Sequence, residues 1–293
     1  MSTELAKAVV DGVLTGGVYA LMAAGLTLIF GVMEIINIAQ GILVVLGAYL
    51  SYVLQIHLGL DPFLGLFITV PVMFFVGVGI EWGFVRRLKQ QNRTALSILV
   101  TFAVAIVIEG ILTQFFSGDL RSLHAWYVDR SLHLLGFYLP YIYLLGFALA
   151  VAGLAALQVF LYRTRTGYSI RASMQNRAGA QLVGIDINRV SAITFGIGAA
   201  VTAAGGMVFG ATTTFNPNSG YDLISRLLVI VVLGGLGSIG GALIAAVVAL
   251  VIEDVTAVLW SPVWASTMFF AVLIVVLIAR PNGLFGRQAA RAQ

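Results

Sequence analysis

Long apolar segments, separated by short polar turns, make up most of the 293-residue chain. The segments are apolar on every side, as the run from Ala242 to Ile252 illustrates. They show neither the one-sided stripe of a soluble helix nor the alternation of a membrane β-barrel strand. Since about 20 mainly apolar residues cross a bilayer as a helix, the pattern predicts an all-α, polytopic transmembrane helical bundle. We expect about eight membrane segments, near residues 8–30, 35–57, 62–85, 94–117, 139–162, 190–213, 226–252 and 263–279.

Two polar breaks framed by glycine interrupt this pattern. The first runs from Gly31 to Gly41 and the second from Gly234 to Gly241. Irregular backbone is tolerated at membrane depth only where it is buried in protein or lines a watery cavity, and paired broken segments are typical of transporter sites. We therefore expect both breaks to line a translocation pathway. The candidate pathway residues are Asn37, Gln40, Gly41, Gly234, Gly235 and Gly237.

Basic residues gather at 86–93, at 163–189 and after position 280. Such clusters mark the cytoplasmic ends of membrane segments, so we expect the loop 118–138 to lie outside. Three apolar segments separate the 163–189 loop from the basic tail, although an even number of crossings is needed to bring both to one side. The segment 226–252, which its glycines split, is therefore expected to re-enter the membrane rather than cross it.

Composition supports one integral membrane domain over residues 1–293. Hydrophobic residues make up 60% of the chain and charged residues 10%, against about 45–50% and about 25% in soluble domains. The net charge of +4 follows from the basic cytoplasmic clusters, and no basic face with interleaved aromatic residues indicates nucleic-acid binding. Membrane lipid is thus the expected surroundings of the chain.

No pattern in the chain indicates catalysis or a metal site. There is no cysteine, and the three histidines fall in expected external loops, without the spacing of zinc ligands. The run from Gly235 to Gly240 fits G-x-G-x-x-G, but the strand and helix alternation of a dinucleotide-binding fold is missing. A G-x4-G-K-[ST] phosphate loop is also missing. We expect no catalytic residue, no metal and no cofactor in this chain, which cannot hydrolyse ATP by itself.

Carboxylates inside membrane segments are costly and are functional by default. Glu109 is the deepest candidate, and it either faces the pathway or pairs with a polar group at a helix contact. Glu34 and the pair Glu253 and Asp254 are expected at segment boundaries. Glu109 also supports an alternative function, that of an ion- or proton-coupled secondary transporter in which this carboxylate is the relay.

The polar stretch of about 163–190 is a candidate cytoplasmic docking loop. Arg171, Asn176 and Arg177 are spaced for one polar helix face. The alternative is an ordinary solvated loop whose arginines only fix the membrane topology. The motif Gly-x3-Arg-Ala-x3-Asn-x3-Ala-x3-Gly-Ile resembles the coupling loop of ABC importer permeases. Its residues here are Gly167, Arg171, Ala172, Asn176, Ala180, Gly184 and Ile185.

Further motifs, in order along nearly the whole chain, resemble the LivH-type permease subunit of branched-chain amino acid importers. They are Tyr19 to Gly31, Ile36 to Gly41, Phe195 to Ala200, Asn216-Pro217, Leu233 to Ile239 and Arg280 to Gly286. The resemblance implies a permease subunit, not an enzyme, in a bacterial inner (plasma) membrane. It implies a second permease subunit, LivM-like or a second copy, two ATP-binding cassette subunits that bind ATP and Mg²⁺, and a periplasmic solute-binding protein. Arg171 and Asn176 would make polar contacts with an ATPase.

Two departures from the family pattern leave the solute open. The first break of the family usually reads Asn-Phe-Ala-His-Gly-Glu, whereas this chain has Gln40 in place of the histidine and Ile42 in place of the acid. The second break commonly has proline where Gly240 stands. The resemblance favours branched-chain or apolar amino acids, and relatives that carry urea, short amides or aromatic acids keep those alternatives open.

Overall fold

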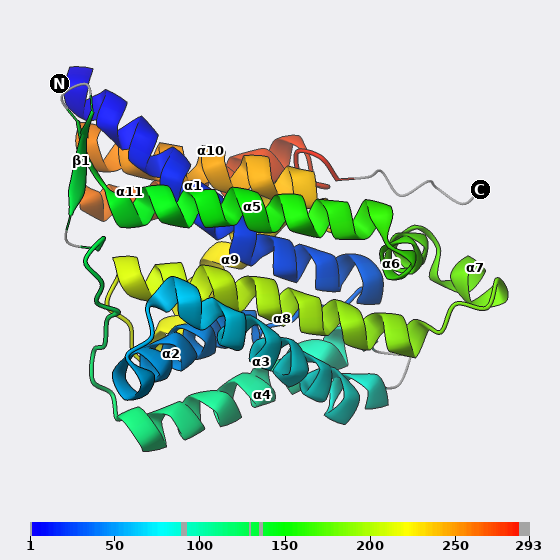
Figure 1. Cartoon of the computed structure of the whole chain (residues 1–293). Helices are drawn as coiled ribbons and strands as arrows, with labels where there is room; N and C mark the ends of the chain where they lie inside the picture. Colours follow the sequence, from blue (N-terminus) through cyan, green and yellow to red (C-terminus); the bar gives the residue numbers. More distant parts are fainter. Residues whose placement is uncertain (1, 89–92, 129, 135–136, 287–293) are drawn as a thin grey trace.

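The computed structural model describes residues 2–88, 93–128, 130–134 and 137–286, which form a bundle of α-helices with one small β-hairpin (Figure 1). The α-helices are α1 (Ser2–Met33), α2 (Gln40–Leu58), α3 (Pro62–Gly83), α4 (Arg93–Phe116), α5 (Tyr141–Arg163), α6 (Arg165–Gln175), α7 (Arg177–Leu182), α8 (Ile187–Thr212), α9 (Gly220–Gly234), α10 (Ile239–Leu259) and α11 (Pro262–Ala279). The antiparallel strands are β1 (Ser131–Leu134) and β2 (Phe137–Pro140).

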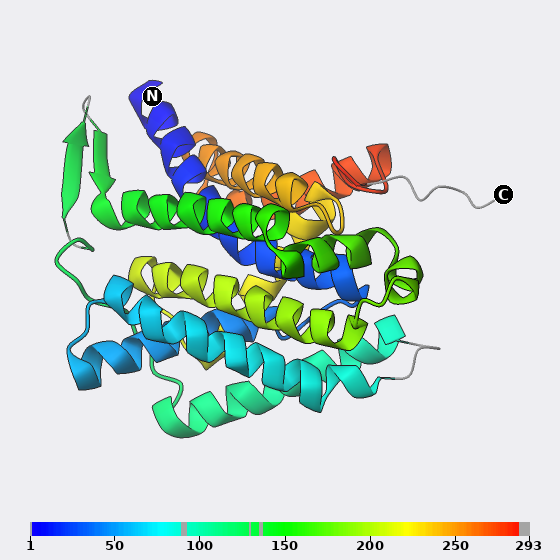
Figure 2. The ribbon, with the colours of Figure 1, turned by 45° about the vertical axis from the view of Figure 1, so that its right-hand side comes forward.

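Eight of the described helices are long and apolar enough to cross a membrane, namely α1 to α5, α8, α10 and α11. The predicted polytopic helical bundle is therefore confirmed. Figures 1 and 2 show α6, α7 and the end of α11 at one end of the bundle and the start of α1 with the β-hairpin at the other. Because α6 and α7 carry the basic loop, we call their end the inner end and the opposite one the outer end. Positions 89–92 and 287–293, which hold part of the basic clusters, lie outside the described residues.

Helices α1 and α8 form the centre of the bundle. Helix α1 packs against α10, α8 and α5, and α8 packs against α3 and α2. Small residues allow the close contacts, since a Cβ atom at Gly12 or Gly16 would lie 2.6 or 2.7 Å from a Cα atom of α10, at Val251 or Val247. Lipid gives little hydrophobic drive for helix association, so close backbone approach and van der Waals packing hold such a bundle together.

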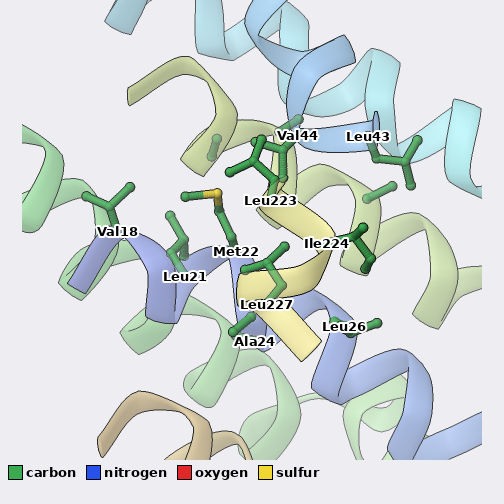
Figure 3. Packing of buried hydrophobic residues seen from close by; sticks show 14 of the residues in the cluster. Val18, Leu21, Met22, Ala24, Leu26, Leu43, Val44, Leu223, Ile224 and Leu227 are labelled. Carbon is green, nitrogen blue, oxygen red and sulfur yellow. The ribbon is translucent and has the colours of Figure 1, made fainter. Parts of the chain in front are cut away.

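Helix α9 packs one side deep into the interior and leaves Tyr221, Asp222 and Ser225 exposed on the other. Figure 3 shows Leu223, Ile224 and Leu227 of α9 packed beside α1, where Met22 and Leu26 lie. The five side chains are buried. At 15 residues, α9 is about 22 Å long, which is shorter than a bilayer core of about 30 Å. Helix α9 is too short to span the membrane, and its apolar side is buried against the other helices.

The interpretation of 226–252 as one re-entrant segment is wrong in its boundaries. The chain forms two helices there, the short α9 and the span-length α10, separated by residues 235–238. Helix α9 returns the chain to the inner end, so α8, α9, α10 and α11 bring the basic loop and the C-terminal segment to the same side (Figure 1). The break itself is confirmed, as is the first one, where residues 34–39 are not helical.

Candidate functional site

A helical hairpin formed by α6 and α7 projects from the inner end, where the sequence predicts the coupling loop. Each of its helices begins at a polar cap. The Thr164 hydroxyl accepts a hydrogen bond from the Gly167 N–H at 3.0 Å, and the Asn176 Oδ1 accepts one from the Gly179 N–H at 2.8 Å. Such caps satisfy N–H groups that the first helical turn leaves free. The local sequence thus explains why this loop folds into two short helices.

The Arg171 guanidinium is bound within the chain. Its Nε donates to the Leu161 carbonyl at 3.0 Å, and its guanidinium carbon lies 4.0 Å from the ring centre of Tyr162 and 5.0 Å from that of Tyr168. A Cβ atom at Gly167 would collide with the backbone of α5. Both residues therefore hold α6 against the end of α5, where a cation also complements the helix dipole. Neither is free to reach outward in this conformation.

The outward surface of the hairpin is its tip, at the end of α7 (Figure 1). The side chains of Leu182 and Val183 are 89% and 78% exposed, although they lie beyond the membrane helices. Gly184, with φ +86°, ends the hairpin in a left-handed turn that disfavours residues with a Cβ. Ala172 is half-buried and Ala180 is buried. Most residues of the sequence motif therefore shape the hairpin, and the two apolar residues at its tip, which sequence reasoning missed, present its surface.

Charged groups connect α7 with the first break. Burial lowers the pKa of the Arg177 guanidinium from its ordinary value, and the carboxylates of Glu34 and Glu81 act in the opposite direction. Glu34 follows α1 at the inner end, as expected of a boundary residue, and has a φ of +53°. Glu81 lies near the end of α3 and is 1% exposed. The charges of Arg177, Glu34 and Glu81 therefore interact across α7, α3 and the break between α1 and α2.

Three candidate pathway residues form one buried cluster at the first break. The Asn37 Nδ2 donates to the Gln40 Oε1 at 2.8 Å, and the Gln40 Nε2 donates to the Thr202 hydroxyl of α8. The Asn37, Gln40 and Thr202 side chains are fully buried. Gly41 lies against α9, since a Cβ atom there would collide with the Gly220 carbonyl. Thr202 is ten residues from the outer end of α8, or about 15 Å, so the cluster sits deep in the bundle.

We expect Gln40→Leu to destabilise the chain by about 1–3 kcal/mol, because Asn37 and Thr202 lose a buried partner. Unfolding of the purified chain in mixed micelles measures the change. Gln175→Leu is the matched control, since Gln175 is exposed at the end of α6 and surface changes usually stay within about 0.5 kcal/mol. Equal stability of both variants would contradict the role given to this cluster.

The second break meets the first one at Gly31, since a Cβ atom at Gly237 would lie 3.5 Å from the Gly31 Cα atom. Gly235 and Gly237 have φ values of +96° and +82°, which glycine adopts readily. The C-terminal segment packs on this turn, where the Leu284 N–H donates to the Leu233 carbonyl at 2.8 Å and the Phe285 N–H to the Gly234 carbonyl at 3.3 Å. Gly41 meets the start of α9, whereas Gly234, Gly235 and Gly237 lie at or just after its end, about 22 Å along the helix. The structure therefore does not bring the two sets of candidate pathway residues together.

Glu109 is paired with a hydroxyl from another helix. The Tyr221 hydroxyl of α9 donates to the Glu109 Oε2 at 2.6 Å. Glu109 lies seven residues before the end of α4, so it is about 10 Å from the outer end of that helix. Tyr221 is 45% exposed. The structure thus shows the second of the two interpretations, a polar pair at a helix contact. Another protein could still contact the pair on its exposed Tyr221 side.

The expectation that Glu253 lies at a segment boundary is wrong. Glu253 belongs to α10, is 8% exposed, and its Oε2 lies 2.7 Å from Nη1 of Arg226 on α9. The guanidinium also lies over the Phe269 ring of α11, 5.4 Å from its centre. An arginine alone in an apolar run signals a buried partner. That signal was available at Arg226, but the sequence could not name the carboxylate 27 positions away.

The chain resembles proteins of known role along most of its length. A family model described as branched-chain amino acid transport system / permease component matches residues 8–277. The chain is 29% identical to the high-affinity branched-chain amino acid transport system permease protein BraD of Pseudomonas aeruginosa, over 95% of this chain and 94% of that one. It is 28% identical to LivH of Escherichia coli K12, a protein of the same description, over 94% of each chain. It is 26% identical to a probable branched-chain amino acid transport permease protein LivH of Methanocaldococcus jannaschii, over 96% of this chain and 92% of that one. No solved structure matches the chain significantly.

Proposed function

Because the chain belongs to the family of branched-chain amino acid transport system permease components, we propose that it forms the solute pathway of an ATP-driven importer. The proposed solutes are branched-chain or other small apolar amino acids, as in the names of its relatives. The chain is a multi-pass membrane protein, and we assign it to a bacterial inner membrane. It is a transport component rather than an enzyme.

The observation that carries this proposal is the tip of the α6–α7 hairpin. Leu182 and Val183 are largely exposed, outside the membrane helices and on the basic side of the chain. Exposed apolar side chains in such a position favour a partner with an apolar groove. The chain has no phosphate loop of its own, so the partner that supplies energy would be an ATP-binding cassette subunit that binds ATP and Mg²⁺.

The proposed assembly holds two permease chains, either this chain with a LivM-like sister or two copies of it. Two ATPases would dock on the two α6–α7 hairpins, and a periplasmic binding protein would deliver the solute at the outer end. The half-buried Glu109 and the exposed Tyr221 favour protein rather than lipid beside α4 and α9, since an intramembrane carboxylate is costly in lipid. The second permease chain is the proposed cover of this face.

Coupling would proceed from the hairpin to the first break. Closure of the ATPase dimer would displace α7, and Arg177 would transmit this movement to Glu34 and Glu81 at the ends of α1 and α3. The polar groups of Asn37, Gln40 and Gly41 are proposed to meet the solute as the bundle rocks between its two states. Gly234, Gly235 and Gly237 are proposed to act on the pathway at its inner end, as the turn on which α9 moves.

The test is purification of the tagged chain in mild detergent, followed by identification of its partners and reconstitution in vesicles with the binding protein. A co-purified P-loop ATPase and ATP-dependent uptake of labelled leucine would support the importer. Uptake driven by an ion gradient without ATPase, and abolished by Glu109→Gln, would instead establish the secondary transporter. The same assay therefore separates the two functions.

A further inference from the structure

A cavity of about 400 Å³ lies among α1, α5, α8, α9 and α10. Its lining includes Tyr143, the third residue of α5, and Thr212, the last residue of α8, together with Thr213 and Thr214 of the linker that follows. These residues place the cavity at the outer end of the bundle. Its volume falls in the range of about 300–1,000 Å³ that small-molecule sites occupy.

The cavity has a polar side and an apolar side. Tyr19, Tyr143 and threonine hydroxyls line it beside the ion pair of Arg226 with Glu253. Its apolar lining consists of Val18, Met22, Val208, Phe209, Leu223 and Leu250. A ligand that fits such a lining carries a hydrogen-bonding head and a compact alkyl group.

The polar side is short of positive charge. Arg226 is the single cation of the lining, and Glu253 neutralises it at 2.7 Å. Asp222 of α9 and Asp254 of α10 also line the cavity, and neither forms an ion pair or hydrogen bond within the described part of the chain. Carboxylates in or beside membrane helices are stable only with a compensating partner or water. Two negative charges thus face a cavity that has room for a cation.

We propose that this cavity binds the ammonium group of a branched aliphatic amine or amino acid. An ammonium has three donors and no acceptor, and the cavity offers Asp222, Asp254 and adjacent hydroxyl oxygens to receive them. The alkyl group lies against the apolar lining. The ligand needs no carboxylate to pair with Arg226, because Glu253 already forms that ion pair. The identity of the ligand as a transported solute rests on the proposed function, and the cavity would then receive it at the outer end before it reaches the first break.

The experiment uses the natural absence of cysteine. In the full chain in nanodiscs, Thr214→Cys places a thiol at the cavity and Ser131→Cys places one on the exposed outer hairpin. The labelling rate of each thiol by a membrane-impermeant maleimide is measured with isoamylamine, leucine or 4-methylpentanoate, at matched potassium chloride. We expect isoamylamine and leucine to slow labelling at position 214 about tenfold. We expect 4-methylpentanoate and potassium chloride to have no effect, and position 131 to be indifferent to all of them.

Charge variants then identify the determinants. Asp254→Asn and, separately, Asp222→Asn should each raise the isoamylamine concentration for half-protection about tenfold, as expected for loss of one charge-assisted hydrogen bond. Asp119→Asn is the matched control, since Asp119 pairs with Arg121 outside the cavity. An unchanged thermal unfolding midpoint in nanodiscs shows that a variant is folded. Asp222 is exposed enough to tolerate substitution if Asp254→Asn does not fold.

Three results would overturn the proposal. They are no labelling at position 214, protection by 4-methylpentanoate or potassium chloride equal to that by isoamylamine, and protection that survives both aspartate substitutions. No ATPase or binding protein takes part in this assay. A negative result therefore leaves the importer proposal intact, and a failed uptake experiment leaves this one intact.

Discussion

Replacing both Leu182 and Val183 with aspartate is expected to abolish ATP-driven uptake while the membrane bundle stays folded. Both side chains are largely exposed, so the substitutions remove no internal packing and should change the unfolding free energy by about 0.5 kcal/mol or less. In an apolar groove of an ATPase, each aspartate would lose its water without gaining a partner. Truncation of a hot-spot residue at the centre of an interface costs about 2 kcal/mol or more, so two buried aspartates in that position should separate the subunits.

The measurement is the amount of ATPase that co-purifies with the tagged chain, together with solute-stimulated ATP hydrolysis. Leu120→Asp is the matched control, because Leu120 is 66% exposed on the loop at the outer end. Its uptake and ATPase content should equal those of the wild type. Normal coupling in the tip variant would show that ATPase docking uses other residues of the hairpin, and the assignment of the tip would have to be abandoned.

Sequence patterns predict the membrane helices because their signal is local. In each apolar run of about 20 residues, the backbone N–H and C=O groups form their hydrogen bonds within the same helix. Hydropathy alone therefore locates the helix. The caps of the hairpin are local in the same way, since Thr164 and Asn176 bond to N–H groups three residues ahead. The polar loop that the sequence marks forms the helices α6 and α7. The sequence did not reveal that Arg171 turns back onto Tyr162 and Tyr168.

The interior position of α9 is not a local property. Residues 226–252 look like a single apolar segment with a glycine break, and only packing decides that α9 and α10 are separate helices. The same limit applies to the partners of charged groups. Hydropathy marks Glu109 as buried in an apolar run, whereas its pairing with Tyr221 joins positions 112 residues apart. One sequence holds no information on which of many polar groups will face it.

Substituting Arg226 by leucine is expected to destabilise the chain more than Gln40→Leu does. Glu253, at 8% exposure, would keep its charge in a low-dielectric site without its guanidinium partner. Breaking a buried ion pair from one side typically costs about 3–5 kcal/mol. Unfolding of the purified chain in mixed micelles measures this loss. Arg121→Leu provides the contrast, since Arg121 and Asp119 pair at 3.3 Å with side chains 33% and 68% exposed, and such surface pairs contribute about 1 kcal/mol or less.

The double variant Arg226→Leu/Glu253→Leu distinguishes the loss of the ion pair from the cost of leaving Glu253 buried without a partner. Removing both charges also removes the desolvation cost, and well-packed apolar replacements of buried pairs are often neutral or stabilising. We therefore expect the double variant to recover most of the stability that Arg226→Leu loses. A double variant as unstable as the single one would mean that Arg226 acts through its contacts with Phe269 and Ser266 rather than through Glu253. If the double variant recovers stability but not uptake, the ion pair between α9 and α10 is required for transport itself and not only for folding.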